Sequence, residues 1–539
     1  MIYDSKPWLK RYDPGVPAEI TIPAMSLVDL LAQSVEQFGD STCIIHGGRE
    51  WSYAELDSAS NRIAHHLLNQ GLKKGDRVGL LLPNTAEFVI GYYGILKAGG
   101  VVMALNPLYT PPEVQALAVE SGIRFLILAG AAYEKILAIK AQTPLEKMIV
   151  VGPGSGLSPE EDVAWDWVMA TQPAGTVTGV SISPDDPAVF QYSGGTTGTP
   201  KCAIGLHRNL VANVHQFRQW LVNTQEGKET VLVAIPCYHV YGMVLGMNLA
   251  IRLGARMVLI DNAGDMDGLL RAIETYQATV FPGVPTLYAA INHYPAVLAG
   301  EYDLSSVKAC ISGSATLPMK VKREFEALTH GHLVEGYGLS EAPTATHCNP
   351  VLGENREGAI GLPLPGVDCR IVDLETGVRD VPVGEVGELI VRGPQVMWGY
   401  HLKPEETAQT LREGWLFTGD VARMDADGYF YLVDRKKDVI KVGGFQVWPN
   451  EVEAVLRQHP KVREAAVAGV LDDEGAEYPK AWVVLNDDAQ ATAEEIRSFC
   501  SDYLTPYKIP REVVFIGALP KTGVGKVLRR VLAAQERSI

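Results

Sequence analysis

Short apolar runs, each bounded by turn residues, recur along the first half of the chain and predict buried strands. They cover residues 77–82, 100–105, 124–128, 147–151 and 255–260. Residues 53–70 and 87–98 have the apolar spacing of helices instead. Strands that alternate with helices are typical of parallel βαβ units. We therefore expect an α/β fold whose large N-terminal domain is built from such units.

The pattern changes from about residue 361 onward. Residues 368–372 and 388–392 alternate between apolar and polar side chains, with Gly and Pro between them, which favours antiparallel strands. A β-rich subdomain is expected there. Further along, helix patterns at 451–458 and 493–503 and strand patterns at 464–470 and 481–485 predict a small α+β domain at the C-terminus.

A dense charge cluster separates these two parts. Residues 434–438 read Asp-Arg-Lys-Lys-Asp and lie between predicted strands at 429–433 and 439–442. We expect this segment to be solvated, and domain boundaries often fall in such connections. The predicted organisation is a large domain over residues 1–433, a linker or hinge over 434–440 and a small domain over 441–539.

One apolar stretch, residues 231–251, has the length of a membrane helix and contains no Asp, Glu, Lys or Arg. Five residues interrupt it: Pro236, His239, Gly242, Gly246 and Asn248. A buried strand, loop and helix is therefore expected rather than a transmembrane segment. The first 17 residues carry charges and lack the apolar core of a secretion signal. We expect a cytoplasmic protein, with peripheral contact to the inner membrane left open.

Composition narrows the classes of function. The chain has 47 basic and 63 acidic residues and a net charge of −16, whereas nucleic-acid recognition normally needs a clustered basic excess. The seven cysteines are scattered without a CxxC pair, which argues against a disulfide framework and a structural zinc site.

The strongest local signal is a loop at residues 192–201 that reads YSGGTTGTPK. Its glycines let backbone N–H groups approach a ligand closely, its hydroxyls donate hydrogen bonds and Lys201 adds a positive charge. Pro200 precedes Lys201, so this is not a Walker A loop. On its own, the loop fits either phosphate binding or a hydroxyl-rich surface turn.

Four further segments join this loop in order: GYGLSE at 336–341, GWLFTGD at 414–420, DRKKD at 434–438 and PKTGVGK at 520–526. Together the five segments resemble the ANL superfamily of adenylate-forming enzymes, which includes acyl-CoA synthetases, nonribosomal peptide adenylation domains and luciferases. The resemblance runs from residues 51–53 to the terminal lysine motif. The chain departs from the usual pattern at Cys202, where glycine is usual, and at Gly443, where serine is common.

Within the superfamily, three segments are most similar to bacterial long-chain fatty-acid–CoA ligases: NPLYT at 106–110, GPQVM at 393–397 and GFQVWPNE at 444–451. The resemblance implies that the chain joins a fatty acid to coenzyme A through an acyl-adenylate, using ATP and Mg²⁺ and releasing AMP and pyrophosphate. It also implies that the small domain moves between the two steps. A carboxylate that attacks the α-phosphorus meets another anion, so such a site needs cations and hydrogen-bond donors more than a nucleophilic side chain.

The resemblance also assigns residues to roles. The residues implied to bind ATP are Ser193, Gly194, Gly195, Thr196, Thr197, Gly198, Lys201, Gly313, Ser314, Ala315, Glu335, Gly336, Tyr337, Gly338, Ser340, Asp420, Tyr431 and Arg435. Thr196 and Glu341 would hold Mg²⁺, which prefers oxygen ligands. The implied catalytic residues are Lys526, Glu341, Lys437, Lys441 and His239. The implied acyl pocket is Val240, Tyr241, Gly242, Gly283 and Val284, and the implied CoA contacts are Gly443, Gly444 and Phe445.

Several of these residues have a simpler interpretation from the residues alone. Asp420 and Arg435 fit ribose binding or a surface ion pair. Tyr337 fits an adenine-stacking face or a turn residue packed on the core. His239, in an apolar run, fits a group near the acyl carboxylate or a buried core histidine.

Four other functions compete with a fatty-acid ligase. An aryl or short-chain acyl-CoA ligase has the same motifs, and a luciferase-like oxidation has no supporting residue. A serine hydrolase would use Gly338–Ala342, which nearly matches G-x-S-x-G but lacks the final glycine. Non-catalytic binding is disfavoured because the expected polar positions are present. The expected partners are the acid, ATP and CoA, without nucleic acid, and either a monomer or a homodimer is compatible with the sequence.

Overall fold

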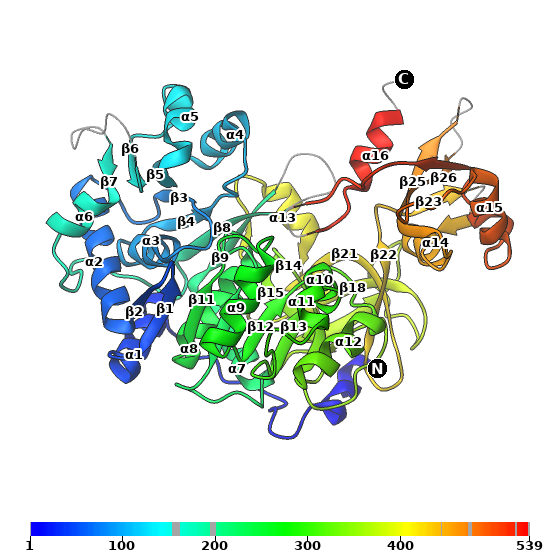
Figure 1. The fold of residues 1–539 in the computed structure, drawn as a ribbon. Helices are drawn as coiled ribbons and strands as arrows, with labels where there is room; N and C mark the ends of the chain where they lie inside the picture. The colour runs from blue at the N-terminus through cyan, green and yellow to red at the C-terminus, as the bar shows by residue number, and fades with distance from the viewer. Residues whose placement is uncertain are drawn as a thin grey trace.

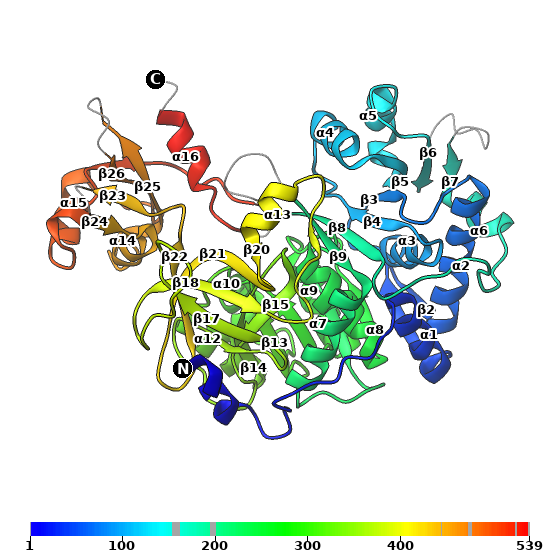
Figure 2. The ribbon, with the colours of Figure 1, turned by 180° about the vertical axis from the view of Figure 1, so that it is seen from behind.

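The computed structural model describes residues 2–153, 162–193, 201–442, 445–472, 477–522 and 525–536. Two large sheets with helices on their faces form the main body, and a smaller domain lies to one side of it (Figure 1). The N-terminal segments η1 (Ile2–Ser5) and η2 (Pro7–Arg11) lie against the β-rich end of the main body (Figure 2).

The first sheet has eight strands in the order β19-β9-β8-β4-β3-β5-β6-β7. Its central strands are parallel, and β9 pairs antiparallel with β8 and with β19. The predicted strands at its centre are confirmed, as are the helices at 53–70 and 87–98. The bounds are β3 Arg77–Leu81, β4 Val101–Ala104, β5 Ile123–Ala129, β6 Lys147–Val151, β7 Val163–Ala164, β8 Pro187–Ser193, β9 Lys201–Leu206, β19 Gly399–Tyr400, α2 Tyr53–Asn69 and α3 Ala86–Lys97.

The second sheet has fourteen strands, thirteen of them in the order β17-β18-β21-β22-β16-β15-β14-β13-β12-β10-β11-β1-β2, while β20 pairs with β21. From β14 to β11 and β1 it is parallel, and from β14 to β17 it is antiparallel. The predicted β-rich region is thus a continuation of the parallel sheet. The bounds are β1 Thr42–His46, β2 Arg49–Ser52, β10 Thr230–Val233, β11 Arg256–Leu259, β12 Val280–Gly283, β13 Ala309–Ser312, β14 His332–Leu339, β15 Ala342–Cys348, β16 Ala359–Pro363, β17 Asp368–Val372, β18 Gly387–Arg392, β20 Leu411–Arg412, β21 Trp415–Met424 and β22 Phe430–Arg435.

Helices cover both faces of each sheet and fill the space between the two sheets. Strand β10 shows the layering: Val231 and Val233 belong to the core between the sheets, while Leu232 belongs to the core on the outer face. The outer face of the first sheet packs on α4 (Pro111–Ser121) and α5 (Gly130–Lys140). The remaining helices of the main body are α1 Leu27–Phe38, α6 Trp165–Thr171, α7 His207–Trp220, η3 Gly242–Asn248, α8 Leu249–Leu253, α9 Met266–Tyr276, α10 Pro285–Asn292, α11 Pro295–Leu298, α12 Met319–Thr329 and α13 Pro404–Thr410.

The apolar stretch 231–251 forms β10, a loop, the π-helical segment η3 and α8, all of them buried. This confirms the predicted strand, loop and helix. Among the described residues, no helix has both the length and the apolarity needed to cross a membrane. The seven cysteines are all buried and unpaired, and Cys202 packs beside Phe190 and Val101.

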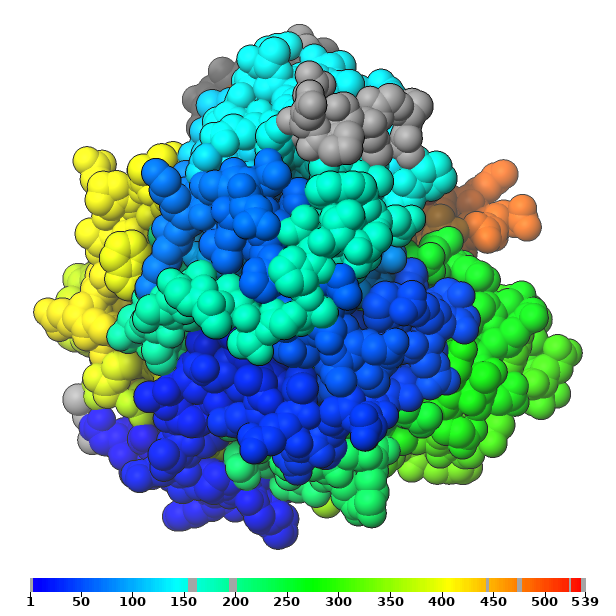
Figure 3. Space-filling model, turned by 90° about the vertical axis from the view of Figure 1, so that its left-hand side faces the viewer, coloured from blue at the N-terminus to red at the C-terminus, as the bar shows by residue number. Residues whose placement is uncertain are grey.

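The small domain is the predicted α+β unit with its own core. Val452, Val467, Val483 and Ile496 are among the buried residues at its centre. Seen from the side of the first sheet, the small domain shows only at one edge, while the segment around α13 forms the opposite edge (Figure 3). Its elements are β23 Ile440–Val442, β24 Phe445–Val447, α14 Pro449–Leu456, β25 Val462–Leu471, β26 Glu477–Leu485, α15 Ala493–Ser501, η4 Pro506–Lys508, β27 Glu512–Phe515 and α16 Arg529–Glu536.

The charged segment 434–438 is less solvated than its composition predicts. Strand β22 continues through Arg435, and Asp434 is only 3% exposed. One Asp434 oxygen accepts a hydrogen bond from Asn450 N–H (2.7 Å), and the other lies 3.5 Å from the guanidinium of Arg529. The expectation of a fully solvated connection was wrong at Asp434, because residues of the small domain cover this carboxylate.

Candidate active site

A cavity of about 1180 Å³ lies where the two sheets and the small domain meet. Gly313, directly after β13, and the β14–β15 hairpin form one wall, which places the cavity at the carboxyl ends of parallel strands, the usual ligand edge of α/β sheets. The segment that leads into α16 reaches from the small domain toward the main body (Figure 1). Through this segment, Lys526 enters the cavity.

The cavity brings together many of the residues that the sequence singled out. Those that line it are Lys201, His239, Val240, Tyr241, Gly313, Ser314, Gly336, Tyr337, Gly338, Ser340, Glu341, Arg435, Lys437 and Lys526. Five of the predicted phosphate-loop residues (Gly194, Gly195, Thr196, Thr197 and Gly198), the side chain of Ser193, and Gly443 and Gly444 lie outside the described residues.

The charged end of the cavity is rich in cations. Burial, with the nearby cations Arg435 and Lys437, lowers the pKa of Lys526 to about 8. Burial also lowers the pKa of Lys437. A cavity that holds these groups without a matching number of carboxylates suits a polyanionic ligand.

His239 lies close to Lys526 and is half-buried. Burial and then the charge of Lys526 lower the pKa of His239 to about 4, so the ring is neutral near pH 7. Its Nδ1 accepts a hydrogen bond from the backbone N–H of Tyr241 (3.2 Å). The proton of the neutral ring is therefore on Nε2, which leaves one donor for a ligand.

Asp420 and Arg435 form the buried pair that the sequence placed at the nucleotide. They are opposite one another on β21 and β22, and Arg435 Nε lies 2.6 Å from Asp420 Oδ1. The hydroxyl of Tyr337 donates to Asp420 Oδ2. Each carboxylate oxygen retains acceptor capacity. The surface-ion-pair interpretation fails, because Asp420 is buried.

The predicted acyl walls need correction. Val240 and Tyr241 line the cavity, but Gly242, Gly283 and Val284 do not. A Cβ on Gly242 would lie 2.4 Å from the Pro236 carbonyl oxygen, so this glycine is packed against backbone. The hydroxyl of Tyr241 donates to the carbonyls of Ile311 (2.6 Å) and Gly283 (3.1 Å). A Cβ on Gly283 would lie 2.6 Å from the Tyr288 ring, so this glycine is packed against a buried tyrosine and not against the cavity.

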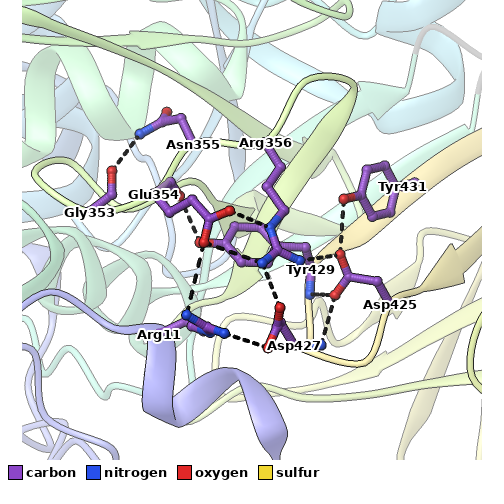
Figure 4. Close-up of polar contacts among 9 residues, drawn as sticks. All are labelled: Arg11, Gly353, Glu354, Asn355, Arg356, Asp425, Asp427, Tyr429 and Tyr431. Carbon is purple, nitrogen blue, oxygen red and sulfur yellow. Dashed lines mark hydrogen bonds and ion pairs between the residues drawn. The ribbon is translucent and has the colours of Figure 1, made fainter.

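Tyr431 was predicted to contact the nucleotide, and the structure places it elsewhere. Its hydroxyl donates to Asp425 Oδ2 (2.9 Å), in an ion-pair cluster outside the cavity (Figure 4). Arg356 joins Asp425 and Asp427 there, each at 2.6 Å, and Arg11 reaches Asp427 from the N-terminal segment. A register shift in the β21–β22 pairing lies between Tyr431 and Arg435, so the alternation of one strand does not carry both residues to the same site.

Five other predicted residues do not line the cavity: Ala315, Glu335, Asp420, Lys441 and Phe445. Asp420 contacts Tyr337 and Arg435, which do line it. Glu335 accepts a hydrogen bond from the Leu317 N–H (2.9 Å), and burial raises its pKa to about 8. It supports the loop that carries Gly313 instead of facing a ligand. Phe445 is 58% exposed and stacks on Tyr507, with ring centres 4.6 Å apart.

Two cavity residues were not found from the sequence. The hydroxyl of Tyr400 donates to Glu341 Oε1 (2.8 Å), and Lys201 Nζ lies 5.1 Å from the centre of the Tyr400 ring. Glu388 accepts from Gly419 N–H (3.2 Å) and from Lys436 Nζ (2.7 Å). Neither residue lies within the motifs named above, and no local pattern in the sequence points to their partners.

The structure also removes the serine-hydrolase alternative. Ser340 lies in the turn between the antiparallel strands β14 and β15. A nucleophile elbow requires a strand that turns sharply into a helix. The match to G-x-S-x-G is therefore part of a hairpin.

Comparison with known proteins agrees with this geometry. Residues 31–401 match the model of the AMP-binding enzyme family, and residues 451–526 match the AMP-binding enzyme C-terminal domain. A Bacillus subtilis protein named long-chain-fatty-acid–CoA ligase is 41% identical, with 98% of each chain covered. A Yersinia pestis protein of the same name is 37% identical, with the same coverage.

Two solved structures illustrate the shared fold. ATP-bound MatB from Rhodopseudomonas palustris has a TM-score of 0.85 at 30% identity, covering 95% of this chain and 99% of its own. The anthranilate CoA ligase AuaEII, in complex with anthranoyl-AMP, also has a TM-score of 0.85 at 28% identity, covering 96% and 99%. With most of its length matched by the family model and full-length relatives above 30% identity, this chain belongs to the family of AMP-binding enzymes.

Proposed function

We propose that this chain is an ATP-dependent acid–thiol ligase that converts a fatty acid to its CoA thioester through an acyl-adenylate, releasing pyrophosphate and then AMP. The observation that carries the proposal is the entry of Lys526, from the small domain, into the cavity that the large domain lines with Lys201 and Glu341. The relatives whose names state this activity support the choice of a long-chain acid.

Adenylation joins two anions, so the site must offset their repulsion. A carboxylate oxygen of the acid attacks the α-phosphorus, and pyrophosphate leaves. With its pKa near 8, Lys526 is mostly protonated at pH 7 and supplies a preorganised ammonium. His239 adds no charge, and its Nε2–H is a donor suited to the acyl carboxylate.

The residues present fit a magnesium ion bound together with substrate phosphates. Among the described residues, no cluster of three or more His, Cys, Asp or Glu could hold a metal by itself. Mg²⁺ in nucleotide sites usually needs only one or two protein carboxylates. Glu341 lines the cavity, and Thr196, outside the described residues, is the second predicted ligand. When bound, the ion would neutralise charge on the phosphates.

The second step needs the small domain to move, and the contacts around Lys437 support it as the hinge. Arg435 is fixed to Asp420, and Lys436 donates its backbone N–H to the Gly419 carbonyl (2.9 Å). Beyond the hinge, Asp438 faces Arg529 of the small domain at 3.5 Å.

A rotation at Lys437 would withdraw Lys526 from the cavity. The same rotation would expose the adenylate to a new face of the small domain, for which Lys441 and Phe445 are the predicted residues. With Phe445 mostly exposed in the present orientation, that face is available for the second step. We keep residues 434–440 as the proposed linker between the two domains.

Apolar side chains line one part of the cavity, and they suit the hydrocarbon chain of a fatty acid. Leu245, Ile311 and Leu339 line it beside Tyr241. An aryl or short acid is the alternative substrate of the same chemistry. Each buried methylene contributes about 0.8 kcal/mol, so a chain-length series separates the two.

The test of the proposed function is acid-dependent exchange of labelled pyrophosphate into ATP. Adenylation predicts exchange that requires the fatty acid and Mg²⁺ and does not require CoA. Production of ADP and orthophosphate, with no exchange, would contradict the proposal. Adding CoA should convert the same mixture to thioester and AMP.

A further inference from the structure

Tyr400 is fixed beside the phosphate-binding end of the cavity by its backbone. Strand β19 pairs with β9, with Tyr400 opposite Ala203, and His401 N–H donates to the Cys202 carbonyl (2.8 Å). On the other side, Met397 N–H donates to the backbone carbonyl of Glu341 (2.8 Å). The segment that carries Tyr400 therefore bridges the strand of Lys201 and the turn of Glu341.

The side chain of Tyr400 touches the two charged residues in different ways. Its hydroxyl donates to Glu341 Oε1 at 2.8 Å, while its ring faces the ammonium of Lys201 at 5.1 Å, within the range of a cation–π contact. The residue is 8% exposed and lines the cavity.

The position of the ring also bears on whether Lys201 and Glu341 can pair with one another. An ammonium and a carboxylate that share a partly dry cavity attract one another strongly. No ion pair joins Lys201 and Glu341 among the described residues, and no further hydrogen bond or ion pair occupies Glu341 Oε2 there. Tyr400 thus leaves one carboxylate oxygen and one ammonium available to a ligand.

We propose that Tyr400 is a positioning residue that orients Glu341 toward the magnesium ion and keeps Glu341 apart from Lys201. The Glu341 carboxylate can then bind Mg²⁺, and the Lys201 ammonium can bind the phosphates. This inference rests on the proposed function, because it requires that Mg²⁺ and ATP bind in this cavity. The phenol touches neither the reacting carboxylate nor the α-phosphate in this account, and acts through Glu341.

The experiment measures binding without turnover. An α,β-methylene analogue of ATP is titrated calorimetrically into each variant, with Mg²⁺ and with EDTA, and the gain in affinity due to Mg²⁺ is the readout. The variants are Tyr400→Phe, which keeps the ring and removes the hydroxyl, and Tyr400→Leu, which removes both. Tyr302→Phe is the matched control, because it removes a 2.7 Å phenol–carboxylate bond to Asp267 that lies away from the cavity.

Tyr400→Phe should lower the gain in analogue affinity due to Mg²⁺ about tenfold, because the variant loses a hydrogen bond to a charged group. The affinity measured in EDTA should not change. Tyr400→Leu should lower both affinities, because Lys201 can then pair with Glu341. Adding Lys201→Met to Tyr400→Leu should restore part of the Mg²⁺-dependent gain. Tyr302→Phe should match the wild type.

An unchanged Mg²⁺-dependent gain in Tyr400→Phe would overturn the inference. Equal losses with and without Mg²⁺, together with a lower Tm, would also overturn it, since they would show a purely structural role. A wild-type protein that does not bind the analogue under either condition would instead count against the proposed function, which separates the two failures.

Discussion

Replacing Lys526 by alanine should separate the two half-reactions. Lys526 belongs to the small domain, yet it lies in the cavity with Arg435 and Lys437 and beside His239. Under the proposed function, the lysine acts in adenylation when the small domain has this orientation. After rotation about Lys437, it would no longer face the adenylate. Lys526→Ala should therefore lower the rate of adenylate formation steeply and still allow supplied acyl-adenylate and CoA to form thioester.

The structure sets the size of this effect. Lowering the lysine pKa from 10.5 to about 8 corresponds to about 3 kcal/mol of unfavourable energy for the charged form in the ligand-free site. A bound anion would relieve this unfavourable energy, so the buried ammonium favours an anionic ligand over water. Loss of one preorganised electrostatic group of this kind typically lowers a rate about 10²–10³-fold. The variant should be no less stable than the wild type, because it removes a cation from among other cations.

The assay runs each half-reaction separately on purified protein. Pyrophosphate exchange reports adenylation, and thioester formation from chemically prepared acyl-adenylate reports the second step. Lys461→Ala is the matched control, since Lys461 is a lysine of the small domain that pairs with Glu495 and does not line the cavity. Thermal unfolding of all three proteins checks that each is folded.

The result that would refute this reasoning is an equal loss of both half-reactions in a folded Lys526→Ala protein. In that case the lysine would act in both steps, or the small domain would keep one orientation throughout. A loss confined to the second step would contradict the placement of Lys526 even more directly.

Three further predictions follow from the same site. Lys437→Pro, which fixes the backbone φ angle at the proposed hinge, should preserve pyrophosphate exchange and lower thioester formation; the opposite pattern would move the hinge elsewhere. The kcat/KM for exchange should fall as the pH rises through about 8, because the free enzyme then loses the Lys526 ammonium, whose folded pKa lies below its unfolded value. No inflection near pH 6.5 is expected from His239, whose pKa is about 4, and a dominant step there would contradict its neutral role. The kcat/KM should rise from hexanoate to decanoate to palmitate, by up to about fourfold per methylene, whereas a preference for benzoate or acetate would favour the alternative substrates.

The elements that the sequence predicted well are those whose pattern is local. The run at 147–151 is β6 with the same bounds, and 368–372 is β17 with the same bounds. A five-residue apolar run between turn residues has few other ways to hide its side chains. The order of the strands was not predictable, since β1 lies next to β11 and β19 lies next to β9, far apart in the chain.

The same distinction explains the errors in the predicted site. The motif residues Lys201, Glu341 and Lys526 do meet in one cavity. Tyr400 was missed because its role depends on the pairing of β19 with β9, for which the sequence has no local signal. Gly283 does not line the cavity because its side-chain position is packed against the Tyr288 ring, a contact that the sequence does not reveal. Asp434 was taken as solvated because its partner Arg529 comes from the far end of the chain.

The central claim is that the acid becomes covalently joined to AMP before CoA reacts. Its most direct test supplies a fatty acid labelled with ¹⁸O in both carboxylate oxygens and follows the label by mass spectrometry in a complete reaction. Attack of the carboxylate on the α-phosphorus, followed by transfer of the acyl group to sulfur, leaves one labelled oxygen on AMP. The account predicts one ¹⁸O per AMP formed and none in pyrophosphate. Label recovered in orthophosphate, with AMP unlabelled, would contradict it.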